Sequence, residues 1–255
     1  MKCFILLGHG RTGSTLLVRS LTEHPNVRMF GELFHYDQPE RERAFHALNK
    51  KFGPGRHETD FYREGEDGAT FLREKVFYQR PWGEILAVGY KMFYLHARGN
   101  PNVSTAWDYL INNKDIHVVH ISRANLLECW VSLKIASITK EWHWQKGAPG
   151  PRTSLPSLEL DPVECENYFN QTLVHRQWAL ERFKDHPAIE IEYEADVVGR
   201  FQETVYKLHD FLEIPRGPAE QILEKMAKRK PREQIVNFAE FKEHFRNTLY
   251  ESFFE

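Results

Sequence analysis

The chain has 255 residues, of which 41% are hydrophobic and 27% are charged, and its formal net charge is −2. This length is enough for one sizeable hydrophobic core. Because the 34 basic and 36 acidic residues nearly cancel, the composition excludes a generally basic nucleic-acid-binding surface and a strongly acidic tail. Binding of an anionic ligand must therefore depend on a few cations at defined positions.

The cysteine content indicates the redox environment. The three cysteines, Cys3, Cys129 and Cys165, give neither a disulfide framework nor a paired-cysteine metal site. This pattern favours a reducing compartment, and we expect a cytoplasmic protein. No apolar run in the sequence reaches the roughly 20 residues that a helix needs to cross a bilayer, so no membrane span is predicted.

Short apolar runs rich in β-branched and aromatic residues alternate with helical patterns along the chain. The runs predict strands at residues 3–7, 27–30, 86–93, 116–121 and 188–193. The helical patterns cover residues 15–21, 104–112, 125–138, 198–212, 218–228 and 232–250, with a longer helix starting at Asp161-Pro162. Strands that alternate with helices build parallel sheets. We therefore predict one α/β domain over residues 1–255, with a central parallel β-sheet flanked by helices.

Two segments do not follow this alternation. Residues 38–83 are polar and aromatic with weak periodicity, and residues 142–156 are rich in Pro, Gly and Trp. In α/β folds such segments often lie at the carboxyl ends of the strands, where substrates bind. We interpret them as acceptor-side insertions, with ordinary surface loops as the alternative.

A glycine-rich loop follows the first predicted strand and leads into the first predicted helix. It reads Gly8-His9-Gly10-Arg11-Thr12-Gly13-Ser14-Thr15 and matches the phosphate-binding loop G-x-x-x-x-G-K-[ST], except that Ser14 replaces the lysine. The predicted strand at 116–121 leads into Arg123, where an NTPase needs an acid for magnesium. The loop therefore predicts anion binding, and both departures argue against nucleotide hydrolysis.

The stretch from Arg11 to Leu17 resembles the 5′-phosphosulfate loop of sulfotransferases that use 3′-phosphoadenosine 5′-phosphosulfate (PAPS). The resemblance implies that residues of this P-loop-like segment hold the phosphosulfate, with Arg11 also neutralising charge on the bridging oxygen. The implied residues are Arg11, Thr12, Gly13, Ser14 and Thr15.

Two further elements resemble the same family. Arg123 and Ser132 stand where the family has an arginine at a strand end and a serine on the following helix, which together hold the 3′-phosphate. Asn125 and Glu128 have capping-box spacing at the start of that helix. Tyr193, in a Tyr-Glu element after the predicted strand at 188–193, is implied to lie near the adenine. The basic run at residues 225–232 falls where family members close a loop over the 3′-phosphate.

The acceptor side is similar to a bacterial carbohydrate branch, that of the trehalose and nodulation-factor sulfotransferases, through Gly31-Glu32 after the first predicted helix. This similarity implies that Glu32 is the general base, and His35 is the rival. Lys91 is a charge within an apolar strand; it either contacts the sulfate or acceptor or reaches solvent at the strand end. Trp142 and Trp144 offer aromatic faces to a sugar ring or anchor their loop.

The resemblance implies a transferase that moves a sulfuryl group from PAPS to an acceptor hydroxyl, with 3′,5′-adenosine bisphosphate (PAP) as product and no metal. We expect a carbohydrate or glycolipid acceptor and no nucleic-acid partner, and we leave a homodimer open. One alternative is a nucleotide or small-molecule kinase of the phosphate-loop class. Another is a non-catalytic module that binds a nucleotide.

Overall fold

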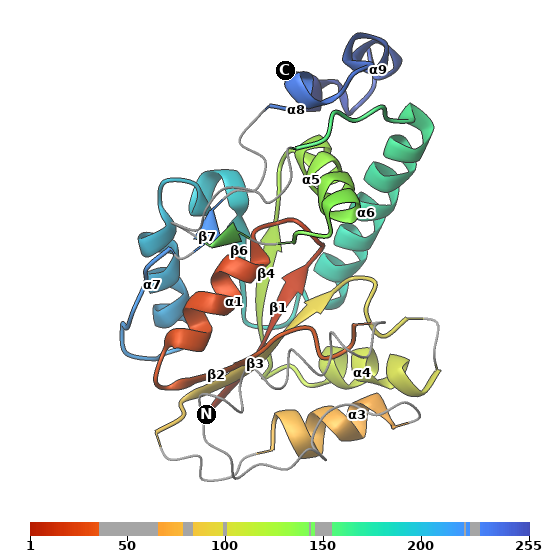
Figure 1. Cartoon of the computed structure of the whole chain (residues 1–255). Helices are drawn as coiled ribbons and strands as arrows, with labels where there is room; N and C mark the ends of the chain where they lie inside the picture. The colour runs from red at the N-terminus through yellow and green to blue at the C-terminus, as the bar shows by residue number, and fades with distance from the viewer. Residues whose placement is uncertain are drawn as a thin grey trace.

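Figure 1 shows the computed structural model, which describes residues 1–35, 66–78, 84–98, 101–142, 144–145, 155–221, 223–224 and 230–255. Within these residues, a sheet of five parallel strands has the order β2-β3-β1-β4-β6. The strands are β1 Lys2–Gly8, β2 Val27–Phe30, β3 Ala87–Phe93, β4 His117–Ser122 and β6 Ala188–Glu192. The predicted α/β class is confirmed, and every strand of this sheet lies within one residue of its expected ends.

Helices pack on both faces of the sheet (Figure 1). One face is covered by α1 Ser14–Glu23 and α7 Phe201–Phe211, whose Leu17 and Leu208 join a core with Leu6 of β1. The other face packs against Phe71, Leu110 and Phe183. These three residues come from α3 Gly68–Phe71, α4 Pro101–Asn112 and the region after α6 Pro162–Arg182, and α3 continues into η1 Leu72–Val76. Burial on both faces explains why the strand sequences are almost continuously apolar.

The strand register brings the segments that follow the strands to one edge. Gly8, the last residue of β1, pairs with Phe93 of β3 and Ile121 of β4, and Ser122 of β4 pairs with Glu192 of β6. Because all these strands are parallel, their carboxyl ends lie side by side. The glycine-rich loop, Arg123 and Tyr193 therefore emerge from the same side of the sheet.

A third hydrophobic core lies beyond this edge of the sheet, at the top of Figure 1. It packs α5 Leu126–Thr139 and α6 against Phe241, Phe245 and Phe254. Phe241 lies in α9 Phe238–His244, Phe245 directly follows that helix, and Phe254 lies in η3 Glu251–Phe254. The short helix α8 Pro231–Gln234 precedes them in the chain. The carbonyl oxygen of Phe253 accepts a hydrogen bond from the Asn125 side chain at 3.0 Å, so these elements also contact the start of α5.

Two helix predictions near the C-terminus are wrong. The expected helix at 232–250 is broken because Leu158 forms a parallel bridge with Ile235, with backbone hydrogen bonds to Gln234 and Val236. In the expected helix at 218–228, residues 218–221 are not helical and β7 Leu223–Glu224 pairs antiparallel with β5 Trp144–Gln145. In both places, pairing with a distant segment overrides local helical periodicity.

The two acceptor-side segments are only partly described. Residues 66–78 of the first contain α3 and η1, whereas residues 36–65, 79–83, 143 and 146–154 lie outside the described residues. The π-helical turn η2 Tyr193–Val197 connects β6 to α7.

None of the helices in the described ranges combines the length and the apolar character needed to cross a membrane.

Gly89 of β3 offers a test of how tightly this sheet packs. A Cβ atom at residue 89 would lie 2.5 Å from two ring atoms of Phe4, whose side chain is fully buried. We expect Gly89→Ala to lower the free energy of unfolding by about 1–3 kcal/mol in urea denaturation, as overpacking of a core typically does. A Cβ at Gly10 would meet nothing within 4 Å, so Gly10→Ala is the control. Equal stability of the two variants would contradict the packing.

Candidate active site

The loop between β1 and α1 leads into a helix N-terminus that no side chain caps. Arg11 and Gly13 adopt left-handed backbone conformations, with φ of 67° and 81°, and the Thr12 hydroxyl donates to the His9 carbonyl oxygen at 3.0 Å. The first turn of α1 contains no acidic residue. The positive end of the helix dipole, starting at Ser14, is therefore suited to an anion.

Gly13 is required at its position because Tyr193 packs directly against it. A Cβ atom at residue 13 would lie 2.5 Å from Cδ2 of Tyr193. The guanidinium carbon of Arg123 lies 4.7 Å from the centre of the same ring, within the range of a cation–π contact. Tyr193 therefore touches both elements that the sequence resemblance assigns to the donor.

Arg11 extends from the loop towards α5. Its Nε donates to Oγ of Ser132 at 2.9 Å, and a terminal nitrogen donates to the backbone carbonyl oxygen of Trp142 at 3.0 Å. The Trp142 ring centre lies 5.9 Å from the guanidinium carbon. The structure thus brings Arg11, Ser132 and Trp142 together. For Trp144, in β5, only the backbone is described.

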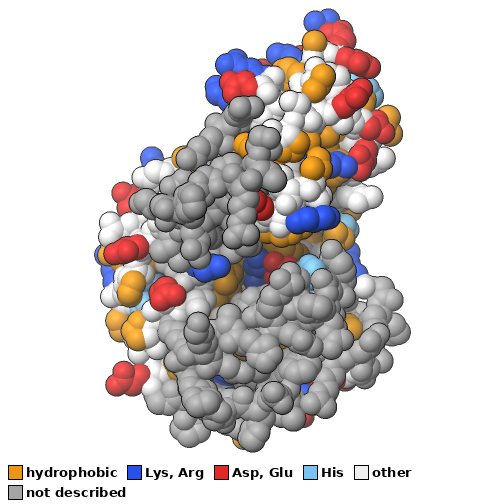
Figure 2. Space-filling model, viewed as in Figure 1, with side chains coloured by type: hydrophobic (Ala, Val, Ile, Leu, Met, Phe, Trp, Pro, Cys, Tyr) orange, Lys and Arg blue, Asp and Glu red, His pale blue; other side chains and the backbone are white. Residues whose placement is uncertain are grey.

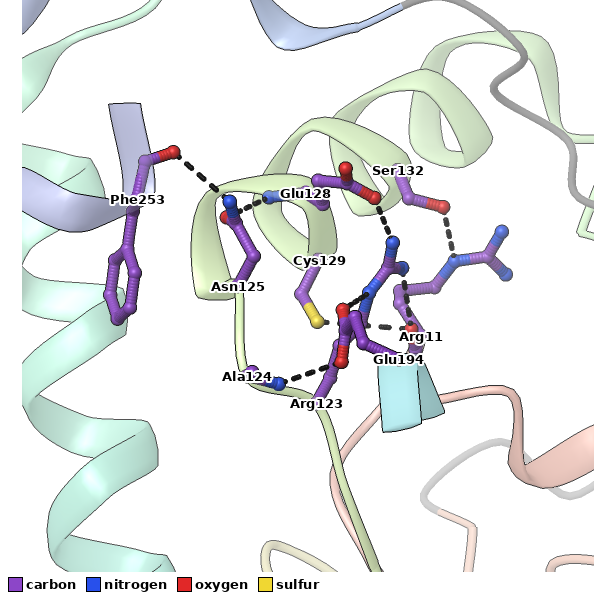
Figure 3. A network of polar contacts seen from close by, with 9 residues as sticks. All are labelled: Arg11, Arg123, Ala124, Asn125, Glu128, Cys129, Ser132, Glu194 and Phe253. Atoms are coloured by element: carbon purple, nitrogen blue, oxygen red, sulfur yellow. Dashed lines mark hydrogen bonds and ion pairs between the residues drawn. The ribbon is translucent and has the colours of Figure 1, made fainter. Parts of the chain in front are cut away.

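Arg123 lies at the centre of a polar network (Figure 3). Its Nε donates to Oε1 of Glu194 at 3.0 Å, and one terminal nitrogen contacts Oε2 of Glu128. The other terminal nitrogen donates to the backbone carbonyl oxygen of Arg11 at 3.2 Å. The Glu194 carboxylate also accepts from the backbone N–H of Ala124 at 2.9 Å. Arg123 therefore ties the loop after β1 to the segments after β4 and β6.

A second polar cluster surrounds Glu32, just after β2. Its Oε1 lies 2.6 Å from Nζ of Lys91, a β3 residue whose side chain is only 7% exposed. Its Oε2 lies 3.5 Å from Nε2 of His96 and 3.8 Å from Nε2 of His35. Lys91 also donates to Oγ1 of Thr15 at 3.2 Å. One ammonium group therefore connects the predicted base with the glycine-rich loop.

The neighbours of Glu32 control its protonation. Burial alone would raise the pKa of the Glu32 carboxyl, but the hydrogen bond from His96 and the charge of Lys91 outweigh burial and hold the pKa well below its ordinary value. Burial lowers the pKa of His96. The backbone N–H of Phe93 donates to Nδ1 of His96 at 3.1 Å, so in the neutral ring the proton is on Nε2, facing Glu32.

The two clusters share the carboxyl edge of the sheet. Figure 2 shows a hollow across the middle of the molecular surface in view, at the level where β1 and β4 end in Figure 1. Basic, acidic and histidine side chains lie inside this hollow. Within the residues that the structure describes, no group of three or more His, Cys, Asp or Glu side chains is arranged to hold a metal ion.

Most of the predicted site residues lie in these clusters. The clusters also contain residues that the sequence reasoning missed, namely His96, Glu128 as an arginine partner, and Glu194. His96 left a signal in the sequence as a histidine one turn after the strand that carries Lys91. Glu128 and Glu194 stood out only through the capping-box spacing and the Tyr-Glu element, and neither pattern predicted the pairing with Arg123. Of the basic run, residues 225–229 lie outside the described residues.

Comparison with known proteins gives a direct family assignment. Residues 4–218 match the family described as "Sulfotransferase family". The chain belongs to the sulfotransferase family. The family predicted from the loop is thereby confirmed, and a sulfotransferase is favoured over a kinase.

Individual relatives of this sulfotransferase are distant. Nodulation protein H from Rhizobium tropici is 25% identical over 264 residues, covering 99% of this chain and 92% of that protein. Nodulation protein H from Rhizobium meliloti (strain 1021) is 28% identical over 269 residues, covering 99% and 94%. A sulfotransferase crystal structure from Alicyclobacillus acidocaldarius aligns with a TM-score of 0.47 and 13% identity, over 96% of this chain and 91% of that one.

The contacts of Glu32 predict a pH-dependent contribution to the stability of the sulfotransferase. Below pH 4.5, the ordinary pKa of this carboxyl, Glu32 takes up a proton in the unfolded chain but stays ionised in the folded protein. The unfolded state then binds more protons, so the free energy of unfolding falls as the pH falls. We expect wild type to lose more stability between pH 6 and about pH 3.5 than Glu32→Gln does, measured by urea denaturation.

Glu23, an exposed carboxylate at the end of α1, provides the matched control. Glu23→Gln should retain the pH dependence of wild type. If Glu32→Gln also retained it, the contacts of Glu32 with Lys91 and His96 would not stabilise its charged form.

Proposed function

We propose that this sulfotransferase uses PAPS to sulfate a hydroxyl group on a carbohydrate or glycolipid, releasing PAP. The observation that carries the proposal is that one lysine, Lys91, contacts both Thr15 of the phosphate loop and Glu32, at 3.2 Å and 2.6 Å. A sulfuryl donor and an acceptor hydroxyl must meet between a phosphate-binding element and a base. The family implies the donor, and the uncapped helix start and the cations fit its anionic groups.

The loop residues Arg11, Thr12, Gly13, Ser14 and Thr15 would hold the 5′-phosphosulfate. In the reaction the acceptor oxygen bonds to sulfur while the bond from sulfur to the 5′-phosphate oxygen breaks. Negative charge then develops on the departing phosphate. The guanidinium of Arg11 and the N-terminus of α1 are placed to stabilise that charge.

Glu32 would accept the proton of the acceptor hydroxyl. While Lys91 is paired with Glu32, the carboxylate is a weak base. An anionic sulfuryl group near Thr15 offers Lys91 a second partner, and movement of the ammonium group away from Glu32 would raise the proton affinity of the carboxylate. Lys91 would thus couple donor binding to activation of the base, with His96 and His35 keeping Glu32 oriented.

Arg123 and Ser132 would bind the 3′-phosphate, and Tyr193 would lie near the adenine. In support, Ser132 already hydrogen-bonds Arg11 and Tyr193 packs between the loop and Arg123. All of these residues follow or face the carboxyl ends of neighbouring strands, which is where nucleotides bind in open α/β sheets.

A carbohydrate acceptor is supported by the Gly31-Glu32 element and by the nodulation-protein relatives. We assign the acceptor to the segments 38–83 and 142–156. The second segment contains Trp142, which lies close to Arg11, and Trp144. The small net charge of −2 gives little general attraction for a polyanionic acceptor, which favours a neutral or weakly charged sugar. Cytoplasmic location stays a prediction from the cysteine content.

Thermal-shift measurements test the donor class. We expect PAP to raise the melting temperature with or without a chelator, because its phosphates are bound by cations of the protein. Stabilisation by Mg-ATP alone, lost on chelation, would instead support a phosphate-loop kinase. Radiolabelled PAPS incubated with carbohydrate and lipid extracts then identifies the acceptor.

Glu32→Gln should lower the rate of sulfuryl transfer by about a hundredfold or more, as loss of a general base typically does. The affinity for PAP should change little, because the substitution leaves the loop intact. His35→Asn is the control and should keep most of the activity. A larger loss in His35→Asn than in Glu32→Gln would assign the base to His35.

Arg123→Ala should weaken PAP binding at least about tenfold and leave the affinity for 5′-AMP nearly unchanged, because only PAP has a 3′-phosphate to pair with the guanidinium. Isothermal titration calorimetry with both nucleotides measures this. Equal losses for the two nucleotides would show that Arg123 acts only by supporting the loop.

A further inference from the structure

The guanidinium group of Arg123, which the proposed function assigns to the 3′-phosphate, is already paired with two carboxylates. Glu194 contacts Nε, and Glu128 contacts a terminal nitrogen. With the bond to the Arg11 carbonyl, each of the three guanidinium nitrogens donates a hydrogen bond within the protein. Figure 3 shows both carboxylates turned towards Arg123.

The Glu194 carboxylate is bound as a phosphate would be. Its two oxygens accept from Arg123 Nε at 3.0 Å and from the backbone N–H of Ala124 at 2.9 Å. A guanidinium together with a backbone amide near a helix start is a common way for proteins to hold phosphate oxygens. Ala124 directly precedes Asn125, the N-cap residue of the 14-residue helix α5, so its backbone N–H lies next to the positive end of that helix.

Exposure indicates which group a ligand meets first. The side chain of Arg123 is 5% exposed, whereas those of Glu128 and Glu194 are 27% and 35% exposed. The guanidinium is therefore covered, and its two acidic partners lie nearer to solvent. A phosphate arriving from solvent meets two negative charges before it can reach the positive one.

Arg123 has other contacts that would hold it if the carboxylates moved away. One terminal nitrogen donates to the Arg11 carbonyl oxygen, and the Tyr193 ring lies 4.7 Å from the guanidinium carbon. The ion pairs with Glu128 and Glu194 are therefore not the sole support of Arg123.

We propose that Glu128 and Glu194 compete with the 3′-phosphate for Arg123, so that nucleotide binding must displace at least one of the two carboxylates. The two residues are thus determinants of nucleotide affinity. They lower the affinity for any nucleotide that carries a 3′-phosphate and leave nucleotides without one unaffected. Because PAP carries the same 3′-phosphate as PAPS, the returning carboxylates also promote release of the product.

The test is calorimetric titration of PAP and 5′-AMP into the purified full chain and its Glu128→Gln, Glu194→Gln and double variants. An amide keeps the shape of the side chain but removes the competing charge. We expect each single variant to bind PAP at least about fivefold more tightly, because the fraction of Arg123 available to phosphate rises. The affinity for 5′-AMP should stay within about twofold, and product inhibition by PAP should become stronger.

Glu164→Gln is the matched control, because it removes a carboxylate that pairs with Lys134 on the same helix α5, without contacting Arg123. It should leave PAP binding unchanged. Weaker or unchanged PAP binding in both Glu128→Gln and Glu194→Gln, with melting temperatures near wild type, would overturn the proposal and show that the carboxylates only position Arg123. So would equal tightening in Glu164→Gln.

Failure of this inference is distinguishable from failure of the proposed function on which it rests. If Arg123→Ala selectively weakens PAP but the glutamine variants do not tighten it, only the competition is wrong. If wild type binds no PAP, while the glutamine variants also bind none, the proposed function is wrong.

Discussion

Lys91 is the only charged residue of the apolar strand β3, and its side chain is buried. A buried ammonium group needs a partner of opposite charge. Glu32 at 2.6 Å provides the counter-charge, and Thr15 at 3.2 Å joins the pair to the loop. The glycine-rich loop has Ser14 where related phosphate loops carry lysine, but β3 brings an ammonium group to the neighbouring threonine. The charge pair thereby fixes β2, β3 and the loop relative to one another at the edge where chemistry would occur.

The polar network around Arg123 has the opposite arrangement of charge from the cluster around Lys91 and Glu32. Around Lys91 one carboxylate is held by several donors, whereas around Arg123 one guanidinium is shared by Glu128 and Glu194. In both places a carboxylate of the protein is paired with a cationic side chain, Lys91 or Arg123, that an anionic substrate would need. Such pairing keeps the partly buried charges compensated in the protein without a ligand. Binding of an anionic substrate at either cation would then exchange one anionic partner for another.

The sequence was sufficient for the sheet and for the position of the glycine-rich loop between β1 and α1, because both depend on local features. A strand buried on both faces is a continuous apolar run, and the loop residues from Arg11 to Thr15 are contiguous. Glu194 and His96 were missed because their roles arise from register: β6 places Glu194 beside Ala124, and a turn after β3 brings His96 to Glu32. The broken helix near Ile235 has the same origin, since its partner Leu158 lies far away in the chain.

The contact between Asn125 and Phe253 has a consequence for biosynthesis. The two residues are 128 positions apart, and Asn125 is the N-cap of the helix that carries Glu128 and Ser132. On the ribosome the loop, β1 and α5 emerge well before this contact can form. The start of α5 can therefore gain this contact only after residue 253 has left the exit tunnel. The bonds of Arg123 to Arg11, Glu128 and Glu194 need no residue beyond 194.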